Sequence, residues 1–76
     1  MYRFLILIEK GNESYGAYTP DLPGCVAVGN TPEEVETNMH EAIKMHLQGM
    51  IEDNEPIPTP HTIARYLDVP VSDPAA

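Results

Sequence analysis

Residues 18–34 read YTPDLPGCVAVGNTPEE, and this stretch decides how the chain folds. Its first half is interrupted by Pro20, Pro23 and Gly24. Each proline removes a backbone donor, and glycine tolerates a left-handed conformation, so no strand continues through these residues. The apolar residues that follow are β-branched or small and come directly after this bend. The sequence therefore predicts a rigid loop followed by a short strand at residues 25–28.

The second half of the same stretch predicts where a helix begins. Thr31 supplies an N-cap side chain, Pro32 occupies the first helical position, and Glu34 is placed to close a capping box. Apolar residues then recur at three- and four-residue spacings, which is typical of a helix with one buried face. The residues on this face are Val35, Met39, Ala42, Ile43, His46, Leu47 and Met50. The helical pattern fades at residues 52–54.

Two further strands are predicted before the loop. Residues 2–9 are rich in Leu, Ile and aromatic side chains and lack Gly and Pro, and residues 14–19 follow after a turn. One face of the first strand carries Tyr2, Phe4, Ile6 and Ile8. The other face carries Leu5 and Leu7. Because both faces are apolar and one helix covers only one of them, the face with Leu5 and Leu7 needs a second copy or a partner.

The C-terminal part of the chain predicts a connector and a last strand. Residues 55–60 alternate proline with other residues, which favours a stiff, extended conformation. Residues 62–69 have the pattern of a strand, and a right-handed crossover would lay it parallel to the first strand. The expected order is β-β-β-α-β, in one α/β (α+β) domain spanning residues 1–71. We expect residues 72–76 to be a frayed tail, and we expect no DNA-binding domain.

The charge of the chain bears on its partners. Among 76 residues, 12 are Asp or Glu and 4 are Lys or Arg, which gives a formal net charge of -8. This sign argues against direct binding of nucleic acid, whose phosphates favour Lys and Arg. It suits a basic protein partner, or it serves only to keep a small protein in solution. With one cysteine, no signal peptide and no membrane-length apolar run, the expected location is the cytoplasm.

Few residues have the spacing that metal or nucleophilic chemistry requires. His40, His46 and His61 do not form a metal-binding motif, and no cofactor is expected. Cys25 could pair with a histidine as a nucleophile, but a lone cysteine at this position fits packing in the core better. A three-stranded meander with one helix also resembles half of a ribonuclease H fold. The neighbouring carboxylates that such nucleases use to hold two metal ions are missing, so we expect no enzyme activity.

Two surfaces remain as candidates for binding. The first combines the proline-framed loop with the acidic start of the helix, and its residues are Asp21, Leu22, Glu33, Glu34 and Glu36. This group suits a basic partner, although each part also reads as an ordinary turn or as the usual acidic bias of a helix N-terminus. The second surface is the sheet face with Leu5 and Leu7, for which burial in a homo-oligomer, either a dimer or a tetramer, is the simpler use.

Taken together, these segments resemble the HicB antitoxin family. The resemblance extends over residues 2–70 and is carried by a specific combination of two motifs. These are YTPDLPGC at 18–25 and GNTPEE at 29–34, supported by EAI at 41–43, Leu47, and IP at 57–58 before the last strand. It implies a partial ribonuclease H-like fold, self-association, and binding to a small, basic toxin of the HicA type.

The resemblance also implies a mode of action. HicA toxins are similar to double-stranded-RNA-binding domains and cleave mRNA with a histidine, and the antitoxin covers them and blocks access of RNA. Many members of the family carry an additional DNA-binding domain, which residues 72–76 do not provide. Two alternatives remain: an orphan homo-oligomeric scaffold without a toxin, and a remnant nuclease or Cys25-dependent hydrolase.

Overall fold

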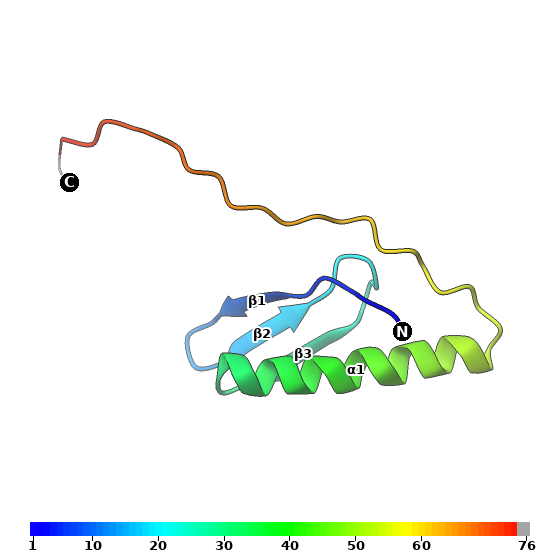
Figure 1. The fold of residues 1–76 in the computed structure, drawn as a ribbon. Coiled ribbons are helices and arrows are strands. Elements are labelled where there is room, and N and C mark those ends of the chain that lie inside the picture. Colours follow the sequence, from blue (N-terminus) through cyan, green and yellow to red (C-terminus); the bar gives the residue numbers. More distant parts are fainter. Residues whose placement is uncertain (75–76) are drawn as a thin grey trace.

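The computed structural model describes residues 1–74 and contains a three-stranded antiparallel sheet with one helix packed against it (Figure 1). The strands are β1 (Leu7–Lys10), β2 (Tyr15–Tyr18) and β3 (Val26–Gly29), and the helix is α1 (Pro32–Glu52). The sheet order is β1-β2-β3, so β1 and β3 are its two edges. The predicted α+β class, with its antiparallel meander and single helix, is confirmed.

The proline-framed loop between β2 and β3 consists of two consecutive turns. The Leu22 amide donates to the Thr19 carbonyl at 3.2 Å, and the Cys25 amide donates to the Leu22 carbonyl at 3.2 Å. Gly24 has a φ of 84°. Proline at the second position and glycine at the third position of the second turn match the requirements of a type II turn. The loop is therefore rigid for the reason that its sequence suggests.

Both ends of α1 are capped by side-chain and backbone hydrogen bonds. At the start, the Glu34 amide donates to Thr31 Oγ1 at 3.0 Å. At the end, Asn54 adopts a φ of 57°, its amide donates to Ile51 O at 3.1 Å, and the Glu55 amide donates to Met50 O at 2.8 Å. This pair of bonds is a Schellman motif with asparagine in the left-handed position. The predicted fading of the helix near residue 53 thus has a local cause.

The core lies between α1 and one face of the sheet. Its buried apolar residues are Ala17, Leu22, Cys25, Val35, Met39 and Leu47. Phe4 and Ile6, from the N-terminal segment, are half-buried and pack against this cluster. The helical stripe predicted from the sequence supplies half of the core, and the loop contributes Leu22 from above the sheet. A core of this size is small even for a short domain.

The opposite face of the sheet is not covered by the described residues. Leu7 is paired with Tyr18, and Tyr18 with Val26, so these three side chains share one face. The neighbouring pair Gly16 and Val28 lies on the same face, and alternation along the chain adds Leu5. We call Leu5, Leu7, Tyr18, Val26 and Val28 the open face. Val26 and Val28 are 64% and 68% exposed, which is unusual for apolar residues in strands.

The predicted first strand is shortened in the structure. Pairing with β2 begins at Leu7, whereas the sequence indicated a strand from residue 2. The register of Leu7 with Tyr18 would place Leu5 opposite Pro20, which has no backbone donor. The chain also turns away from the sheet after Tyr18. The N-terminal segment therefore runs past the end of its neighbour and crosses above α1 (Figure 1).

The expected returning strand is not formed. Residues 62–69 are extended, but within residues 1–74 they have no strand partner, and the expected parallel pairing with the first strand is wrong for this structure. Instead, residues 55–74, which we call the arm, leave the end of α1 and run clear of the sheet (Figure 1). Prolines at 56, 58 and 60 keep the connector extended. Of the predicted frayed tail, residues 75–76 lie outside the described residues.

Candidate protein-interaction surfaces

Asp21 anchors the arm to the loop. Its side chain is 2% exposed. The Thr62 hydroxyl donates to Asp21 Oδ1 at 3.0 Å, and the Thr62 amide lies 3.4 Å from Asp21 Oδ2. His61 Nδ1 lies 3.6 Å from Asp21 Oδ1 and adds a charge interaction when the imidazole is protonated. The carboxylate is therefore used inside the chain, 41 positions away in sequence from the residue that it binds.

The five residues predicted to face a partner divide into two groups. Asp21 and Leu22 are buried, and Leu22 is 1% exposed within the core. Glu33, Glu34 and Glu36 are exposed along the first turns of α1. A partner that approaches this conformation meets the three glutamates, whereas Asp21 and Leu22 shape the loop beside them. The structure does not bring the side chains of the two groups together into one surface.

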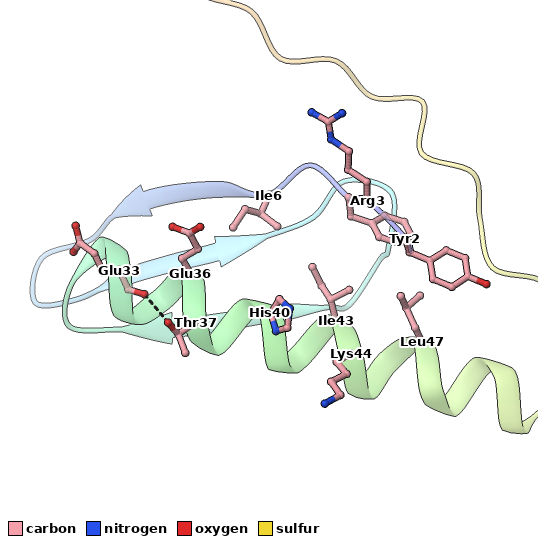
Figure 2. A pocket seen from close by; sticks show the side chains of 11 residues that line it. Tyr2, Arg3, Ile6, Glu33, Glu36, Thr37, His40, Ile43, Lys44 and Leu47 are labelled. Carbon is pink, nitrogen blue, oxygen red and sulfur yellow. Dashed lines mark hydrogen bonds between the residues drawn. The ribbon is translucent and has the colours of Figure 1, made fainter.

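A groove lies between the N-terminal segment and α1 (Figure 2). Its walls come from residues on both elements. The N-terminal segment contributes Tyr2, Arg3, Phe4 and Ile6, and α1 contributes Glu33, Glu36, Thr37, His40, Ile43, Lys44 and Leu47. The floor is apolar and the rim is charged. Such a groove, open along its length, is shaped for an extended or helical segment more than for a small molecule.

The charges around the groove are unevenly distributed. Glu33 and Glu36 lie at the end that is nearest the start of α1, whereas Arg3 lies toward the other end with its side chain pointing away from α1 (Figure 2). His40 Nδ1 is 3.7 Å from the exposed carboxylate of Glu41. Because these groups are solvent-exposed, each ion pair contributes little to stability. Their value lies in selecting which charged side chains a bound segment presents.

The open face carries the residues predicted for self-association. Leu5 and Leu7 are half-buried, and the rest of the open face is exposed. The sequence indicated an apolar second face from the first strand alone. The structure adds Val26 and Val28 from β3, whose short strand gave no clear alternation. Contiguous exposed apolar surface of this kind marks an interaction site in most globular proteins.

The chain offers little to catalysis within its described residues. Cys25 lies in the core, as the packing interpretation expected, and burial raises the pKa of its thiol above the usual value. Cys25 and His46 line the same shallow depression, but a raised pKa disfavours the reactive thiolate. Residues 1–74 contain no group of three or more His, Cys, Asp or Glu side chains arranged to hold a metal ion.

Two groups of residues were not singled out as site residues from sequence. His61 and Thr62, which bind Asp21, are distant in the chain and carry no motif. Arg3 and Lys44 line the groove and likewise belong to no sequence motif. The fold alone places these two side chains on one surface, on opposite sides of the groove between the N-terminal segment and α1.

None of the helices in the described part of the chain is long and apolar enough to cross a membrane.

A family model and several known proteins match most of the chain. A model of the HicB-like antitoxin of bacterial toxin–antitoxin systems matches residues 4–73. The chain is 43% identical over 65 residues to an uncharacterized 14.9 kDa protein of the rep–hol intergenic region of Haemophilus phage HP1, covering 86% of this chain and 49% of the relative. The chain thus spans about half the length of that phage protein.

Two further matches cover most of this chain and most of the matched protein. A UPF0150 protein of Synechocystis is 33% identical over 70 residues, which are 91% of this chain and 89% of the relative. A chain in the solved HicA3 and HicB3 toxin–antitoxin complex superposes with a TM-score of 0.63 at 31% identity, covering 78% of this chain and 72% of that chain. The chain therefore belongs to the HicB-like antitoxin family of bacterial toxin–antitoxin systems.

Proposed function

We propose that this protein is an antitoxin that binds and neutralises a small, basic, RNA-cleaving toxin of the HicA type. Its action is stoichiometric binding and not catalysis. The support is the family membership together with the similarity to a chain from a HicA3 and HicB3 complex. The chemistry agrees, because the described residues present acidic side chains at the start of α1 and exposed apolar side chains on the sheet.

The proposed mechanism is electrostatic and steric masking. A toxin that cleaves RNA needs cationic side chains to hold the phosphate backbone. An acidic protein with a formal charge of -8 competes for those side chains and accelerates the encounter with a basic partner. Once bound, a protein of this size covers the surface that RNA must reach. This interaction would take place in the cytoplasm, where the toxin meets its substrate.

We assign Glu33, Glu34 and Glu36 to the toxin interface because they are exposed at the rigid start of α1. The Thr31 cap and the two turns of the loop hold the backbone of this region in one conformation, so the positions from which the carboxylates project are set before binding. Preorganised charges lose less conformational entropy on binding than mobile ones. We assign Asp21 and Leu22 the indirect role of fixing the loop beside these glutamates, and we assign Leu5 and Leu7 to self-association.

The test begins with co-purification of this chain and the product of its adjacent small reading frame. The purified product is then assayed for RNA cleavage with and without the chain. Under the proposal, the two proteins form a complex, and cleavage stops at equimolar antitoxin. An adjacent product that cleaves RNA but is neither bound nor inhibited by the chain would rule the proposal out. RNA incubated with this chain alone and Mg²⁺ tests the remaining nuclease alternative.

The assignment of Glu33 and Glu36 to the toxin interface is tested by reversing their charges. The double substitution Glu33→Lys and Glu36→Lys should weaken toxin binding by at least about tenfold, because both attractive pairs become repulsive. The matched control, Glu9→Lys with Glu52→Lys, changes the net charge by the same amount at other exposed sites. Equal loss in both variants would indicate that only overall charge matters. Thermal melts of each variant check that α1 tolerates lysines near its N-terminus.

A further inference from the structure

Residues 63–71 of the arm have the composition of a strand, but they pair with none of the three strands of the described chain. From residue 63 onward its odd-numbered residues are mainly apolar, namely Ile63, Leu67, Val69 and Val71, with Arg65 among them. These four side chains are between 70% and 83% exposed. Tyr66 on the even-numbered side is also fully exposed. Burying such side chains is favourable, so the arm is stabilised when it finds a partner.

The overall dimensions show that the chain is more extended than a compact domain of the same length. The radius of gyration is 16.1 Å and the principal extents are 58 × 29 × 19 Å. A compact domain of this length has a radius of gyration of about 11 Å. The excess comes from the arm, which runs away from the body beyond its anchor at Thr62 (Figure 1). The hydrogen bonds to Asp21 fix the point of departure and leave residues 63–71 extended beyond it.

The free edge beside β1 has the complementary features. Residues 2–6 lie past the start of the β1–β2 ladder, and the groove beneath them is lined by Phe4, Ile6, Ile43 and Leu47. An extended segment laid along this edge would gain backbone hydrogen bonds and place alternate side chains in the groove. The other edge is less suitable, because Asn38 Nδ2 already donates to the Val28 carbonyl at 2.8 Å.

We propose that residues 62–71 of one chain add as a fourth strand to residues 2–6 and β1 of a second copy, and that the two copies exchange arms reciprocally. The odd-numbered apolar residues of the arm fill the groove. Tyr66 then lies on the other face, against Leu5 and Leu7. The sheet of each copy thereby gains a fourth strand from the arm of the other copy.

A second copy is the occupant that the structure favours. Every chain carries one arm and one free edge, so a reciprocal exchange satisfies both without leftover surface and closes with two-fold symmetry. The arm of the same chain is directed away from its own groove by the stiff proline connector and the Asp21–Thr62 anchor. The inference concerns the chain by itself and holds whether or not a toxin is bound.

The first test compares the mass in solution of the full chain with that of two variants, by sedimentation equilibrium. Leu67→Asp changes the arm, and Met45→Asp is a matched control on α1, outside both the groove and the open face. Both side chains are exposed, at 83% and 70%, so neither substitution disturbs the core. We expect the wild type and Met45→Asp to be dimers or larger, and we expect the dissociation constant of Leu67→Asp to rise roughly 100-fold or more.

The second test distinguishes exchange from an arm that folds back on its own chain. Amide hydrogen exchange of residues 3–6 and 63–69 should slow as protein concentration rises, because pairing requires a second copy. Protection at monomeric mass, independent of concentration, would overturn the proposal in favour of the arm of the same chain. A wild type that stays monomeric and unprotected would also overturn it, as would a Leu67→Asp variant that keeps the wild-type mass or a Met45→Asp variant that dissociates as readily as Leu67→Asp.

Discussion

At the scale of single residues, glycine and aspartate carry the constraints that no other residue could satisfy here. A Cβ on Gly29 would lie 2.6 Å from the Val35 amide nitrogen, so β3 reaches the first turn of α1 with no room for a side chain. Asp21 is the counterpart among polar residues, because its buried carboxylate satisfies two donors of Thr62. The first residue sets how closely the sheet and the helix approach, and the second sets where the arm departs.

The prediction at this scale is that Gly29→Ala destabilises the fold. The added methyl group meets backbone atoms of α1, which cannot move aside as a flexible side chain would, so we expect a loss of about 1–3 kcal/mol in the free energy of unfolding. The matched control is Gly49→Ala, where a Cβ meets no atom within 4 Å. That change should stabilise the helix by up to about 1 kcal/mol. Urea denaturation of both variants measures the difference, and equal effects would contradict the close approach.

At the scale of elements, the helix is defined by its ends and the strands by a proline. The Thr31 cap and the Asn54 Schellman motif set the start and the end of α1. Pro20 sets the beginning of the β1–β2 ladder, since the register would otherwise continue to Leu5. These local features explain why the helix agrees with its sequence pattern and why the first strand is shorter than its pattern.

The prediction at the element scale concerns the helix cap. Thr31→Ala leaves the Glu34 amide without its acceptor at 3.0 Å and should lower the free energy of unfolding by about 0.5–2 kcal/mol. Thr31→Ser and Thr31→Asp keep an acceptor oxygen in place and should retain most of the stability. Thermal unfolding followed by circular dichroism at 222 nm would report the three variants. An alanine variant as stable as the serine variant would mean that the cap contributes little.

At the scale of the whole molecule, the two main features are the negative net charge and the apolar surface that the described residues leave uncovered. The formal charge of -8 is spread over a small body, while the open face and the arm expose apolar side chains. Highly charged, partly apolar surfaces are typical of proteins that function in complexes. The proposed roles divide these surfaces between two partners. The acidic helix start serves a basic toxin, and the arm and its groove serve a second copy.

The whole-molecule prediction is a strong salt dependence of toxin association. Attraction between oppositely charged proteins raises the association rate constant by about 10- to 1,000-fold at low ionic strength, and salt screens it. We therefore expect this rate constant to fall at least tenfold between roughly 0.05 and 0.5 M NaCl, with a smaller change in the dissociation rate constant. Stopped-flow mixing at several salt concentrations gives both constants. An association rate constant that does not vary with salt would show that the net charge does not drive toxin binding.

The candidate site could be predicted only in part, because exposure depends on contacts between distant residues. Glu33, Glu34 and Glu36 follow a helix cap, and local geometry alone keeps such residues at the surface. Asp21 has the same carboxylate, yet Thr62 buries it. The groove rim similarly joins Arg3 to residues of α1 through packing and not through any motif. Sequence reasoning found the charges that local structure exposes and missed those that tertiary contacts use.

The sequence by itself determined the elements whose signals are local: the loop framed by Pro20, Pro23 and Gly24, the capped and amphipathic helix, and the three-stranded meander. Turn and cap preferences act over a few residues, so their outcome needs no knowledge of the rest of the chain. Tertiary structure alone decided where residues 62–69 go. Their strand pattern specifies an extended backbone but not a partner, because strand pairing is a long-range contact. The prolines and the Asp21–Thr62 anchor carry this segment away from the sheet.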